Sequence, residues 1–487
     1  MKISDIIDLR ECLYSNVAPE TEFSDITTNP DDVTDSSLLI IPNSAKISHD
    51  KNLPQSPVAI ICDAPELFPN EAMIIVENPR RTLAESLRRY HNIDFSKFKT
   101  IGITGTNGKT STAAMIKRIL TECGHKVGSI GTGSIEIDGN PINEKYYSMT
   151  TPDPELLYET LKKMEREGCT AVIMEVSSHA LALEKVSAIP FDYGIFTNLG
   201  EDHLDFHGNK DRYFEAKLKL FSICKTAIFN IDDPYVRRAL GLSRTERTIN
   251  TGVIWRGDVY ATDVENRGLD GISYMYHGKN FIFKMNLRLA GIYNVYNSLL
   301  ASALAIDMGC KPCEVKKAVE SIEEIHGRYE IIKGDVTAII DYAHTPTAFE
   351  AILKELRALS ENDELWVVFG CGGQRDREKR PQMAKIAEKY TKNIIVTSDN
   401  PRDEDKNIIF EDIKRGFSEE HQIIENRKEA IKKAILSAKE NSLIAIIGKG
   451  CEPYYIDKIG YHDYSERRVV EEALTERRMK NKYANKA

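Results

Sequence analysis

Glycines, a lysine and a threonine with the spacing of a phosphate-binding loop lie between Gly102 and Thr112, in the order Gly-Ile-Thr-Gly-Thr-Asn-Gly-Lys-Thr-Ser-Thr. The glycines let backbone N–H groups face a chain of phosphates, and a helix starting there directs its positive end at the same anions. Lys109 can reach the outer phosphates and the Thr110 hydroxyl can bind Mg²⁺. The loop is one residue longer than the usual pattern. We predict a site for ATP or a similar nucleotide, against the alternative of a glycine-rich turn that binds nothing.

Further polar side chains follow apolar runs later in the chain. Glu175 ends such a run and precedes Ser177 and His179. A carboxylate in that position is costly to bury unless it is paired or bound to a cation. His203 lies in a second acidic and histidine-rich segment. Because Mg²⁺ prefers oxygen ligands, His203 by itself is read as a loop histidine rather than a metal ligand.

Regular secondary structure must position these side chains, and the apolar runs predict where the strands and helices lie. Strands are expected at 38–42, 58–62, 72–76, 171–175, 193–197, 227–230, 336–341, 365–370, 393–397 and 443–448, with a helix at 81–90. From the phosphate-binding loop onward, such runs alternate with helical patterns, which favours an α/β fold with doubly wound, mostly parallel sheets. Ligands of such sheets bind in the loops that follow the strands.

Composition indicates a globular protein of several domains. The chain has 487 residues, of which 41% are hydrophobic and 29% charged, and a net charge of −9. This length suggests about three domains, and the negative charge disfavours a protein that coats nucleic acid. No apolar run is long enough to span a membrane and the start does not resemble a signal peptide, so we expect a cytoplasmic protein. Its nine cysteines fit a reducing compartment, and Cys310 and Cys313 are read as structural. The basic stretch 477–482 is read as a solvated helix end.

Five motifs in one order resemble the Mur ligases. They are the long phosphate-binding loop, Glu-Val-Ser-Ser-His at 175–179, Asp-His-Leu-Asp-Phe-His-Gly at 202–208, Tyr-Phe-Glu-Ala-Lys at 213–217 and Asp-Tyr-Ala-His-Thr-Pro at 341–346. The resemblance runs from about residue 75 to the end. Within the family it is greatest to the UDP-N-acetylmuramoyl-tripeptide synthetases (MurE).

The resemblance implies an ATP-driven amide ligase of peptidoglycan synthesis. ATP would phosphorylate a carboxylate of UDP-MurNAc-L-Ala-D-Glu, and a diamino acid would attack the acyl phosphate. It also implies three α/β domains. These are a divergent and shortened UDP-substrate domain at 1–97, a central P-loop ATP-binding domain with a parallel sheet at 98–328, and a Rossmann-like amino-acid domain at 329–487.

The family's functional residues carry over by position. The implied catalytic residues are Lys109, Glu175, His203, Lys217 and Arg328. The implied ATP contacts are Gly105, Thr106, Asn107, Gly108, Lys109, Thr110, Ser111, Asn294, Arg328 and Asp341. Thr110, Glu175, His203 and Lys217 are the implied Mg²⁺ ligands, with Lys217 as the carbamate N6-carboxylysine. An unmodified lysine would repel the cation, whereas a carbamate is an anionic ligand.

The two remaining substrates have implied contacts as well. The MurNAc-dipeptide would meet Thr150, Thr151, Ser177 and Lys185, and the amino acid would meet Arg375, Asn400, Arg402, Gly448 and Glu452. Arg402 favours meso-diaminopimelate, because its guanidinium can bind the far carboxylate by two hydrogen bonds, whereas the ammonium of L-lysine would be repelled. Cys451 stands where diaminopimelate-adding members usually have histidine, so L-lysine stays an alternative.

Two further readings remain open. A divergent Mur or folylpolyglutamate-type ligase with another acceptor shares the core, and the first 97 residues lack the usual uridine motifs, so no residue there is assigned. A non-catalytic ATP-binding assembly or regulatory partner is disfavoured, because Lys109, Glu175, His203 and Lys217 are all intact.

Overall fold

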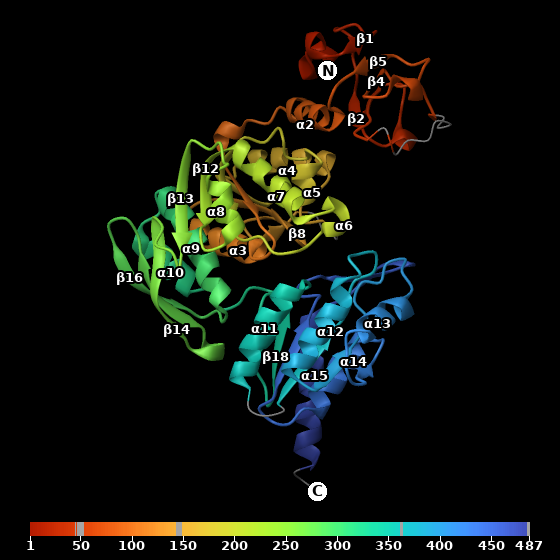
Figure 1. The fold of residues 1–487 in the computed structure, drawn as a ribbon. Coiled ribbons are helices and arrows are strands. Elements are labelled where there is room, and N and C mark those ends of the chain that lie inside the picture. The colour runs from red at the N-terminus through yellow and green to blue at the C-terminus, as the bar shows by residue number, and fades with distance from the viewer. Residues whose placement is uncertain (44, 46–52, 143–148, 361–363, 485–487) are drawn as a thin grey trace.

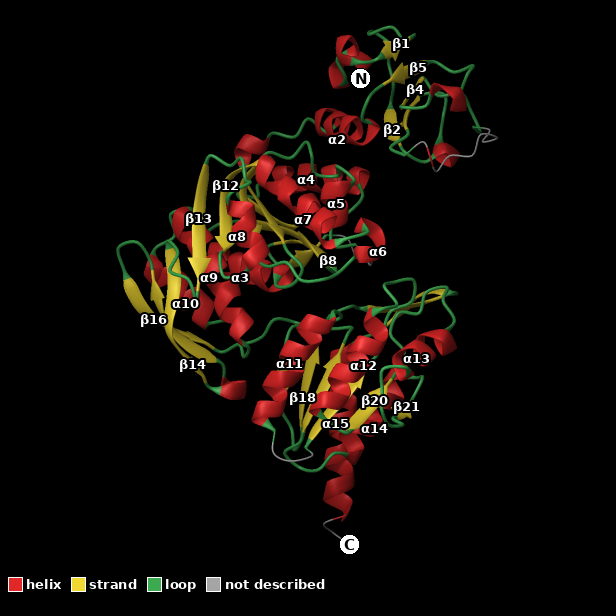
Figure 2. Cartoon of the chain, in the orientation of Figure 1, coloured by secondary structure: helices red, strands yellow, loops and turns green. Residues whose placement is uncertain are grey.

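The protein forms three successive bodies of α/β structure, red-orange, orange-to-green and blue in Figure 1. The structure is a computed structural model and describes residues 1–43, 45, 53–142, 149–360 and 364–484. Figure 2 shows strands flanked by helices in the two larger bodies. The α/β prediction is confirmed.

The first body is built on a small sheet near the N-terminus. Its strands are, in spatial order, β1 (Tyr14–Ser15), β5 (Met73–Ile75), β4 (Ala59–Cys62), β3 (Ser37–Ile40) and β2 (Asp25–Thr27). All but β1 run parallel. Helices α1 (Ile3–Ile6) and α2 (Pro79–Tyr90) complete this part, and α2 leads to the second sheet. Leu83 and Leu87 of α2 join the hydrophobic core that lies beneath one face of the second sheet.

The second sheet is the largest. Its strands are, in spatial order, β16 (Ile282–Leu287), β15 (Ile272–His277), β14 (Val259–Asn266), β13 (Arg247–Gly252), β12 (Cys224–Asn230), β11 (Phe191–Phe196), β6 (Lys99–Thr104), β10 (Ala171–Glu175), β7 (Val127–Gly131), β8 (Ser134–Ile137) and β9 (Asn140–Pro141). The section from β14 to β7 is parallel, and the two edges are antiparallel. Strands β7 to β9 and β13 to β16 were not predicted.

Helices cover both faces of the second sheet. They are α3 (Lys109–Glu122), α4 (Pro154–Arg166), α5 (Ser178–Ala182), α6 (Leu204–His207), α7 (Lys210–Leu218), α8 (Pro234–Leu240), α9 (Ile292–Asp307) and α10 (Pro312–Glu320). The apolar sides of α3, α9 and α10 share one core with Ile101 and Ile103 of β6, whereas α4 and α7 pack on the opposite face. In β10, Ala171 and Ile173 point to the first of these cores and Val172 and Met174 to the second, as expected for a parallel strand buried on both faces.

The third sheet combines a parallel centre with an antiparallel edge strand. Its strands are, in spatial order, β17 (Glu330–Ile332), β18 (Thr337–Asp341), β22 (Leu443–Ile447), β19 (Leu365–Phe369), β20 (Asn393–Val396) and β21 (Gln422–Ile423). Helices α11 (Pro346–Leu359), α12 (Lys379–Tyr390) and α13 (Lys406–Lys414) pack on one face, and α14 (Arg427–Ser437) and α15 (Glu466–Ala484) pack on the other. A hairpin of β23 (Tyr454–Asp457) and β24 (Gly460–Asp463) extends from it.

The predicted strands are all present, with boundaries that differ from the prediction by at most three residues. The basic stretch 477–482 is only partly the solvated helix end that we predicted. Arg477 is buried and donates to Asp335 and to the carbonyls of Ile435 and Ala438 at 2.6–2.7 Å. It therefore fastens α15 to the end of α14 and to the turn before β18. Across the residues described, no helix is both long and apolar enough to cross a membrane.

Candidate active site

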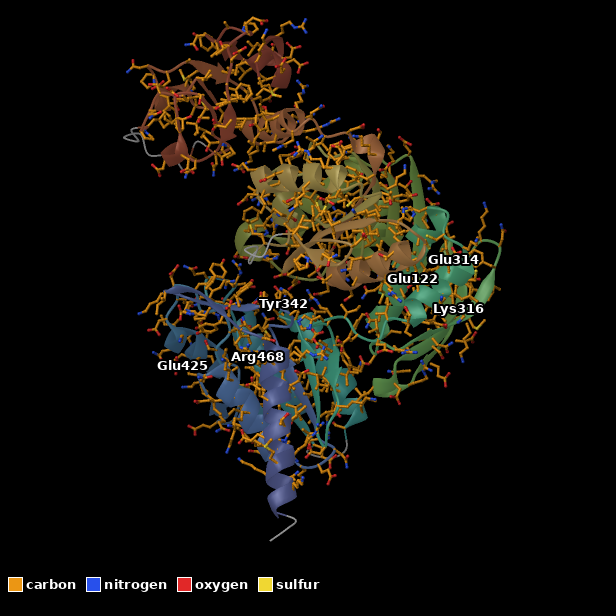
Figure 3. The ribbon with its side chains drawn as sticks, turned by 180° about the vertical axis from the view of Figure 1, so that it is seen from behind. Glu122, Glu314, Lys316, Tyr342, Glu425 and Arg468 are labelled. Atoms are coloured by element: carbon orange, nitrogen blue, oxygen red, sulfur yellow. The ribbon has the colours of Figure 1, made fainter. Side chains whose placement is uncertain are left out.

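A cavity of about 660 Å³ lies where the second and third sheets face each other. Both parts supply its walls, and Tyr342 marks their junction in the view from behind (Figure 3). The predicted residues that line it are Thr106, Asn107, Gly108, Lys109, Thr110, Ser111, Thr150, Glu175, His203, Asn294, Arg328, Asp341, Arg375, Asn400, Arg402, Gly448 and Glu452. Most of the predicted ATP and amino-acid contacts therefore meet in one place.

The phosphate-binding loop joins β6 to α3. Its backbone requires glycine: Gly105 and Gly108 both have positive φ, and a Cβ on Gly105 would lie 1.9 Å from the Thr197 hydroxyl. Lys109 Nζ donates to the carbonyls of Gly105 and Thr106, each at 2.9 Å. Burial lowers the pKa of this lysine. A cation and the N-terminus of α3 are thus held together at the loop, an arrangement suited to phosphate.

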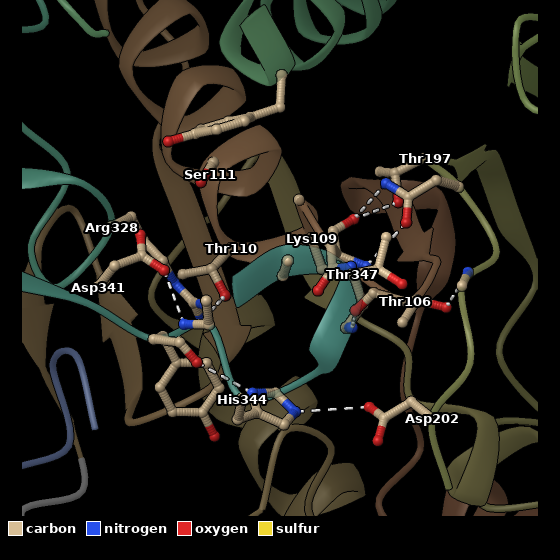
Figure 4. Close-up of a pocket in the computed structure, with 18 of the residues that line it drawn as sticks. Thr106, Lys109, Thr110, Ser111, Thr197, Asp202, Arg328, Asp341, His344 and Thr347 are labelled. Carbon is tan, nitrogen blue, oxygen red and sulfur yellow. Dashed lines mark hydrogen bonds and ion pairs between the residues drawn. The ribbon is translucent and has the colours of Figure 1, made fainter. Parts of the chain in front are cut away.

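A chain of polar contacts crosses from the second sheet to the segment that precedes the third. The Thr110 hydroxyl accepts from Arg328 Nη2 at 2.9 Å (Figure 4). The same hydroxyl donates to Glu175 Oε2, also at 2.9 Å. Glu175 ends β10, which pairs in register with β6, so its carboxylate stands beside the phosphate-binding loop. Gly131 makes room for it, because a Cβ there would lie 2.4 Å from Glu175 Oε1.

Two predicted nucleotide contacts are buried beside this chain. Asp341 accepts from the backbone N–H groups of Tyr329 and Ala343, each at 2.7 Å, and burial raises its pKa. Asn294 lies in the first turn of α9 and donates to the Ala290 carbonyl at 2.7 Å. Both side chains are therefore held by neighbouring backbone at the cavity wall.

Histidines and a carboxylate gather next to the loop. His203 Nε2 and His344 Nε2 lie 3.4 and 3.5 Å from Asp202 Oδ2, so His344 of the third part meets Asp202 of the second (Figure 4). Burial lowers the pKa of His203 to about 3, which keeps its imidazole neutral and able to bind a metal. Burial opposes ionisation of Asp202, but the hydrogen bond from His344 and its charge outweigh this and lower the carboxyl pKa.

Lys217 lies behind the loop rather than in the cavity lining. It is 1% exposed, its Nζ donates to the Gly105 carbonyl at 2.9 Å, and the same nitrogen lies 4.5 Å from the centre of the Tyr213 ring. Burial and then the charge of Lys109 lower its pKa well below the usual value. The buried amine is therefore biased towards its neutral form.

The predicted amino-acid contacts lie on loops of the third part. Asn400 donates to Glu452 Oε2 at 2.7 Å, and Arg402 Nη1 donates to the Gly373 carbonyl at 2.8 Å. Burial and then the positive charge of Arg402 lower the pKa of Arg375. Two guanidinium groups thus share one region, which favours an anionic ligand.

The predicted dipeptide contacts divide into two groups. Thr150 lines the cavity, whereas Thr151, Ser177 and Lys185 do not. Thr151 is buried and donates to the Glu175 carbonyl at 2.9 Å, and the Ser177 side chain caps α5. Lys185 Nζ forms an ion pair with Asp153 at 2.7 Å. Thr151 therefore also supports the strand end that carries Glu175.

Several cavity residues were not among the sequence predictions. Asp202 and His344 were within quoted motifs but were given no role. Lys449 is completely buried and donates to Asn400 Oδ1 at 2.7 Å and to Glu452 Oε2 at 3.2 Å. The Gly-Lys-Gly setting of Lys449 at the end of an apolar run was the available signal.

Only some of the metal ligands that Mg²⁺ needs are supplied by side chains of the cavity. Thr110 and Glu175 offer the oxygen atoms that Mg²⁺ prefers, and they are already in contact. Within the described ranges, no three side chains of histidine, cysteine, aspartate or glutamate form a group that could hold a metal by themselves. Further oxygen atoms, such as those of nucleotide phosphates and water, would therefore complete the coordination.

Known proteins share this architecture and sequence. Residues 103–305 match the Mur ligase middle domain, and residues 327–450 match the Mur ligase, glutamate ligase domain. The UDP-N-acetylmuramoyl-L-alanyl-D-glutamate–2,6-diaminopimelate ligase of Aquifex aeolicus is 41% identical over 82% of this chain and 83% of its own length. The enzyme of that name from Bacillus cereus is 34% identical over 98% of this chain and 99% of its own.

Solved structures extend the comparison to three dimensions. A UDP-N-acetylmuramoyl-L-alanyl-D-glutamate–2,6-diaminopimelate ligase superposes with a TM-score of 0.68 at 26% identity, over 98% of this chain and 99% of that one. Folylpolyglutamate synthase from Mycobacterium tuberculosis shares the fold at 19% identity, with a TM-score of 0.63 over 75% of this chain and 92% of that one. By its two matching domains, and by its identity to full-length relatives, this chain belongs to the Mur ligase family.

Proposed function

We propose that this protein is an ATP-dependent, ADP-forming ligase that adds meso-diaminopimelate to UDP-MurNAc-L-Ala-D-Glu. The observation that carries the proposal is the shared cavity, in which Lys109, Glu175 and Arg328 face the same space as Arg375 and Arg402. Relatives over most of the chain's length bear the name of that reaction. The proposed domains, 1–97, 98–328 and 329–487, would bind the UDP substrate, ATP and the amino acid.

The first half-reaction would transfer a phosphoryl group. Lys109 and Arg328 would neutralise the charge on the transferring group, and such positioned cations act most strongly where water is excluded. Thr110 and Glu175 would hold Mg²⁺ against the phosphates. When bound, the metal would lower the repulsion between the triphosphate and the incoming carboxylate. The product is an acyl phosphate of the D-glutamyl side.

The second half-reaction would form the amide. The amino group of diaminopimelate attacks the acyl carbon, phosphate leaves, and the amine loses its proton. Arg402 and Arg375 would bind the carboxylate at the far end of the amino acid, while Glu452, held by Asn400 and Lys449, would accept from its ammonium group. The mutual repulsion of the two guanidinium groups favours a substrate with a carboxylate at its far end over L-lysine, which has an ammonium group there.

We also propose that Lys217 carries a carbamate. Carbon dioxide reacts with a neutral amine, losing a proton as the N–C bond forms, and burial favours that form in Lys217. The resulting carboxylate would lie beside the phosphate-binding loop, where Lys217 Nζ contacts the Gly105 carbonyl. The carbamate would be a second anionic ligand for Mg²⁺, in addition to the Glu175 carboxylate, with His203 as a neutral ligand.

Phosphate release tests the reaction directly. The purified chain would be given ATP, Mg²⁺ and UDP-MurNAc-L-Ala-D-Glu with meso-diaminopimelate, with L-lysine or with no amine. Strong stimulation by meso-diaminopimelate alone is expected. Stimulation by L-lysine instead would overturn the amino-acid assignment, and no stimulation by either would overturn the proposed reaction.

A further inference from the structure

Arg380 is the largest side chain of the described residues that is completely buried. It lies in the first turn of α12, outside the lining of the cavity. Its guanidinium binds Glu404 by two hydrogen bonds of 2.7 and 2.8 Å, and Asp412 by a third of 2.9 Å. A buried charge is costly unless such partners surround it. A fork of this kind also fixes its partners in one plane.

The contacts of Arg380 reach the two loops that carry the cavity arginines. Its Nη2 donates to the Gly372 carbonyl at 3.2 Å, in the loop of Arg375. Glu404 belongs to the loop of Arg402, and its Oε2 also accepts from the Gln374 backbone at 2.7 Å. Arg380 and Glu404 together therefore bridge residues 372–375 and 400–404.

Backbone contacts complete the bridge. The Gly373 N–H donates to the Asn400 carbonyl at 2.9 Å, and Arg402 donates back to the Gly373 carbonyl at 2.8 Å. A Cβ on Gly373 would lie 1.9 Å from the Pro401 carbonyl oxygen. The two loops are consequently in backbone contact with no space between them.

Both loops also contain backbone conformations that need support. Gln374 and Arg402 have φ of +52° and +54°, in the left-handed region that disfavours side chains. Such conformations persist where surrounding contacts enforce them. Glu404 holds Gln374 by its N–H, and Arg380 holds Glu404.

We propose that Arg380 is a positioning residue for recognition of the amino acid. It sets the distance and orientation between Arg375 and Arg402, so that both can meet one carboxylate. It acts through Glu404 and the Gly372 carbonyl and does not touch the substrate. The inference rests on the proposed function, because it takes Arg375 and Arg402 as the amino-acid contacts.

The test compares KM values in the full-length Arg380→Lys variant. Lysine keeps the charge but cannot bind Glu404 and Asp412 as a planar fork. Because small misplacements of binding groups have large effects, we expect the KM for meso-diaminopimelate to rise about tenfold to a hundredfold. The KM for ATP should stay within about twofold, since the contacts of the phosphate-binding loop are untouched.

Arg415→Lys is the matched control. Arg415 also pairs with Asp412, at 3.1 Å, but its side chain is 71% exposed and it lies at the end of α13. The same chemical change there should leave both KM values unaltered. A general loss of stability would instead raise the KM for ATP and for the amino acid together, or lower kcat alone.

A second variant covers failure of Arg380→Lys to fold. Glu404→Gln keeps an oxygen that can accept from Gln374 but removes the charge that pairs with Arg380, and we expect a smaller rise in the same KM. If Arg380→Lys folds and its KM for meso-diaminopimelate is unchanged, the positioning role is overturned. If Arg380→Lys does not fold, an unchanged KM for meso-diaminopimelate in Glu404→Gln overturns it. If the wild-type chain itself shows no amino-acid-stimulated phosphate release, the proposed function is wrong and this inference falls with it.

Discussion

The phosphate half of the cavity and the amino-acid half are held in different ways. In the phosphate half, the functional side chains project from the ends of regular elements: Glu175 ends β10, and Lys109 and Thr110 begin α3. In the amino-acid half, Arg375 and Arg402 lie on loops whose shape depends on a buried ion pair between Arg380 and Glu404. A site on regular elements is fixed by nearby sequence, whereas a site on loops depends on residues that never reach the ligand.

Replacing Lys109 should have the largest effect and would define the phosphate half. Lys109→Ala removes the cation that spans the loop carbonyls, so we expect phosphate release to fall about a hundredfold to a thousandfold or more. The steady-state rate with all substrates checks this, and thermal melting confirms folding. Substantial remaining ligation would show that the loop does not bind the transferring phosphate.

Substitution of Lys217 tests whether the phosphate half needs the proposed carbamate, a modification that the sequence does not encode. Lys217→Met keeps an unbranched apolar chain in the buried site but cannot form a carbamate, and a lost metal ligand should lower turnover about tenfold to a hundredfold. Removal of CO₂ and its restoration as bicarbonate should lower and restore wild-type activity but leave the variant unchanged. Equal activity of variant and wild type would contradict the carbamate.

Gly131 probes how tightly the phosphate half is packed. In Gly131→Ala the new methyl group would displace the Glu175 carboxylate, and we expect about a tenfold rise in the Mg²⁺ concentration needed for half-maximal rate. Gly241→Ala is the control, because the atom nearest to its Cβ, the Arg238 carbonyl oxygen, would be 3.8 Å away. The same Mg²⁺ dependence in both variants would argue against Glu175 as a ligand.

Substitution of Arg402 should weaken binding of the amino acid but not of ATP, which distinguishes the two halves of the cavity. Arg402→Ala removes charge-assisted hydrogen bonds to the far carboxylate, so the KM for meso-diaminopimelate should rise about tenfold or more. The KM for ATP should change little, because Arg402 contacts only its own part of the cavity. If both KM values rise equally, Arg402 supports the cavity as a whole and the contrast between the halves is lost.

The smallest effect is expected at Glu355, which lies on α11 outside the lining of the cavity. Burial raises its pKa to about 7, and its Oε1 has no hydrogen-bond partner among the described residues. Between its unfolded pKa near 4.5 and about 7, the folded protein binds the extra proton, so the contribution of Glu355 to stability falls as pH rises through this window. Glu355→Gln should therefore raise Tm by about 2–4 °C at pH 8 and change it little at pH 5. A larger gain at pH 5 than at pH 8 would contradict this.

The sequence was sufficient for the regular elements and for the local part of the site. Strand β10 was predicted with its observed ends, because its apolar residues are contiguous and Glu175 stops them. The phosphate-binding loop was predicted because its function depends on residues adjacent in sequence. Strands β13 to β16, of which the last three form the antiparallel edge, were missed because their burial does not follow a regular alternation.

Residues that stabilise the fold or the site through contacts distant in the sequence could not be predicted in this way. Arg380 appears in the sequence as one more charge on the helix from Lys379, and only the fold encloses it between Glu404 and Asp412. Arg477 was read as solvated for the same reason. In both cases the acidic partners lie 24 or more residues away in the chain, beyond the reach of periodicity.

The contact between Gly327 and the loop at Cys451 determines which of these two positions tolerates substitution. Gly327 has φ of +66°, and a Cβ there would lie 2.0 Å from the backbone nitrogen of Cys451. The nearest atoms to such a Cβ all belong to the main chain of residues 450 and 451. A side chain at 327 would therefore collide whatever residue stands at 451, whereas this contact places no constraint on the side chain at 451.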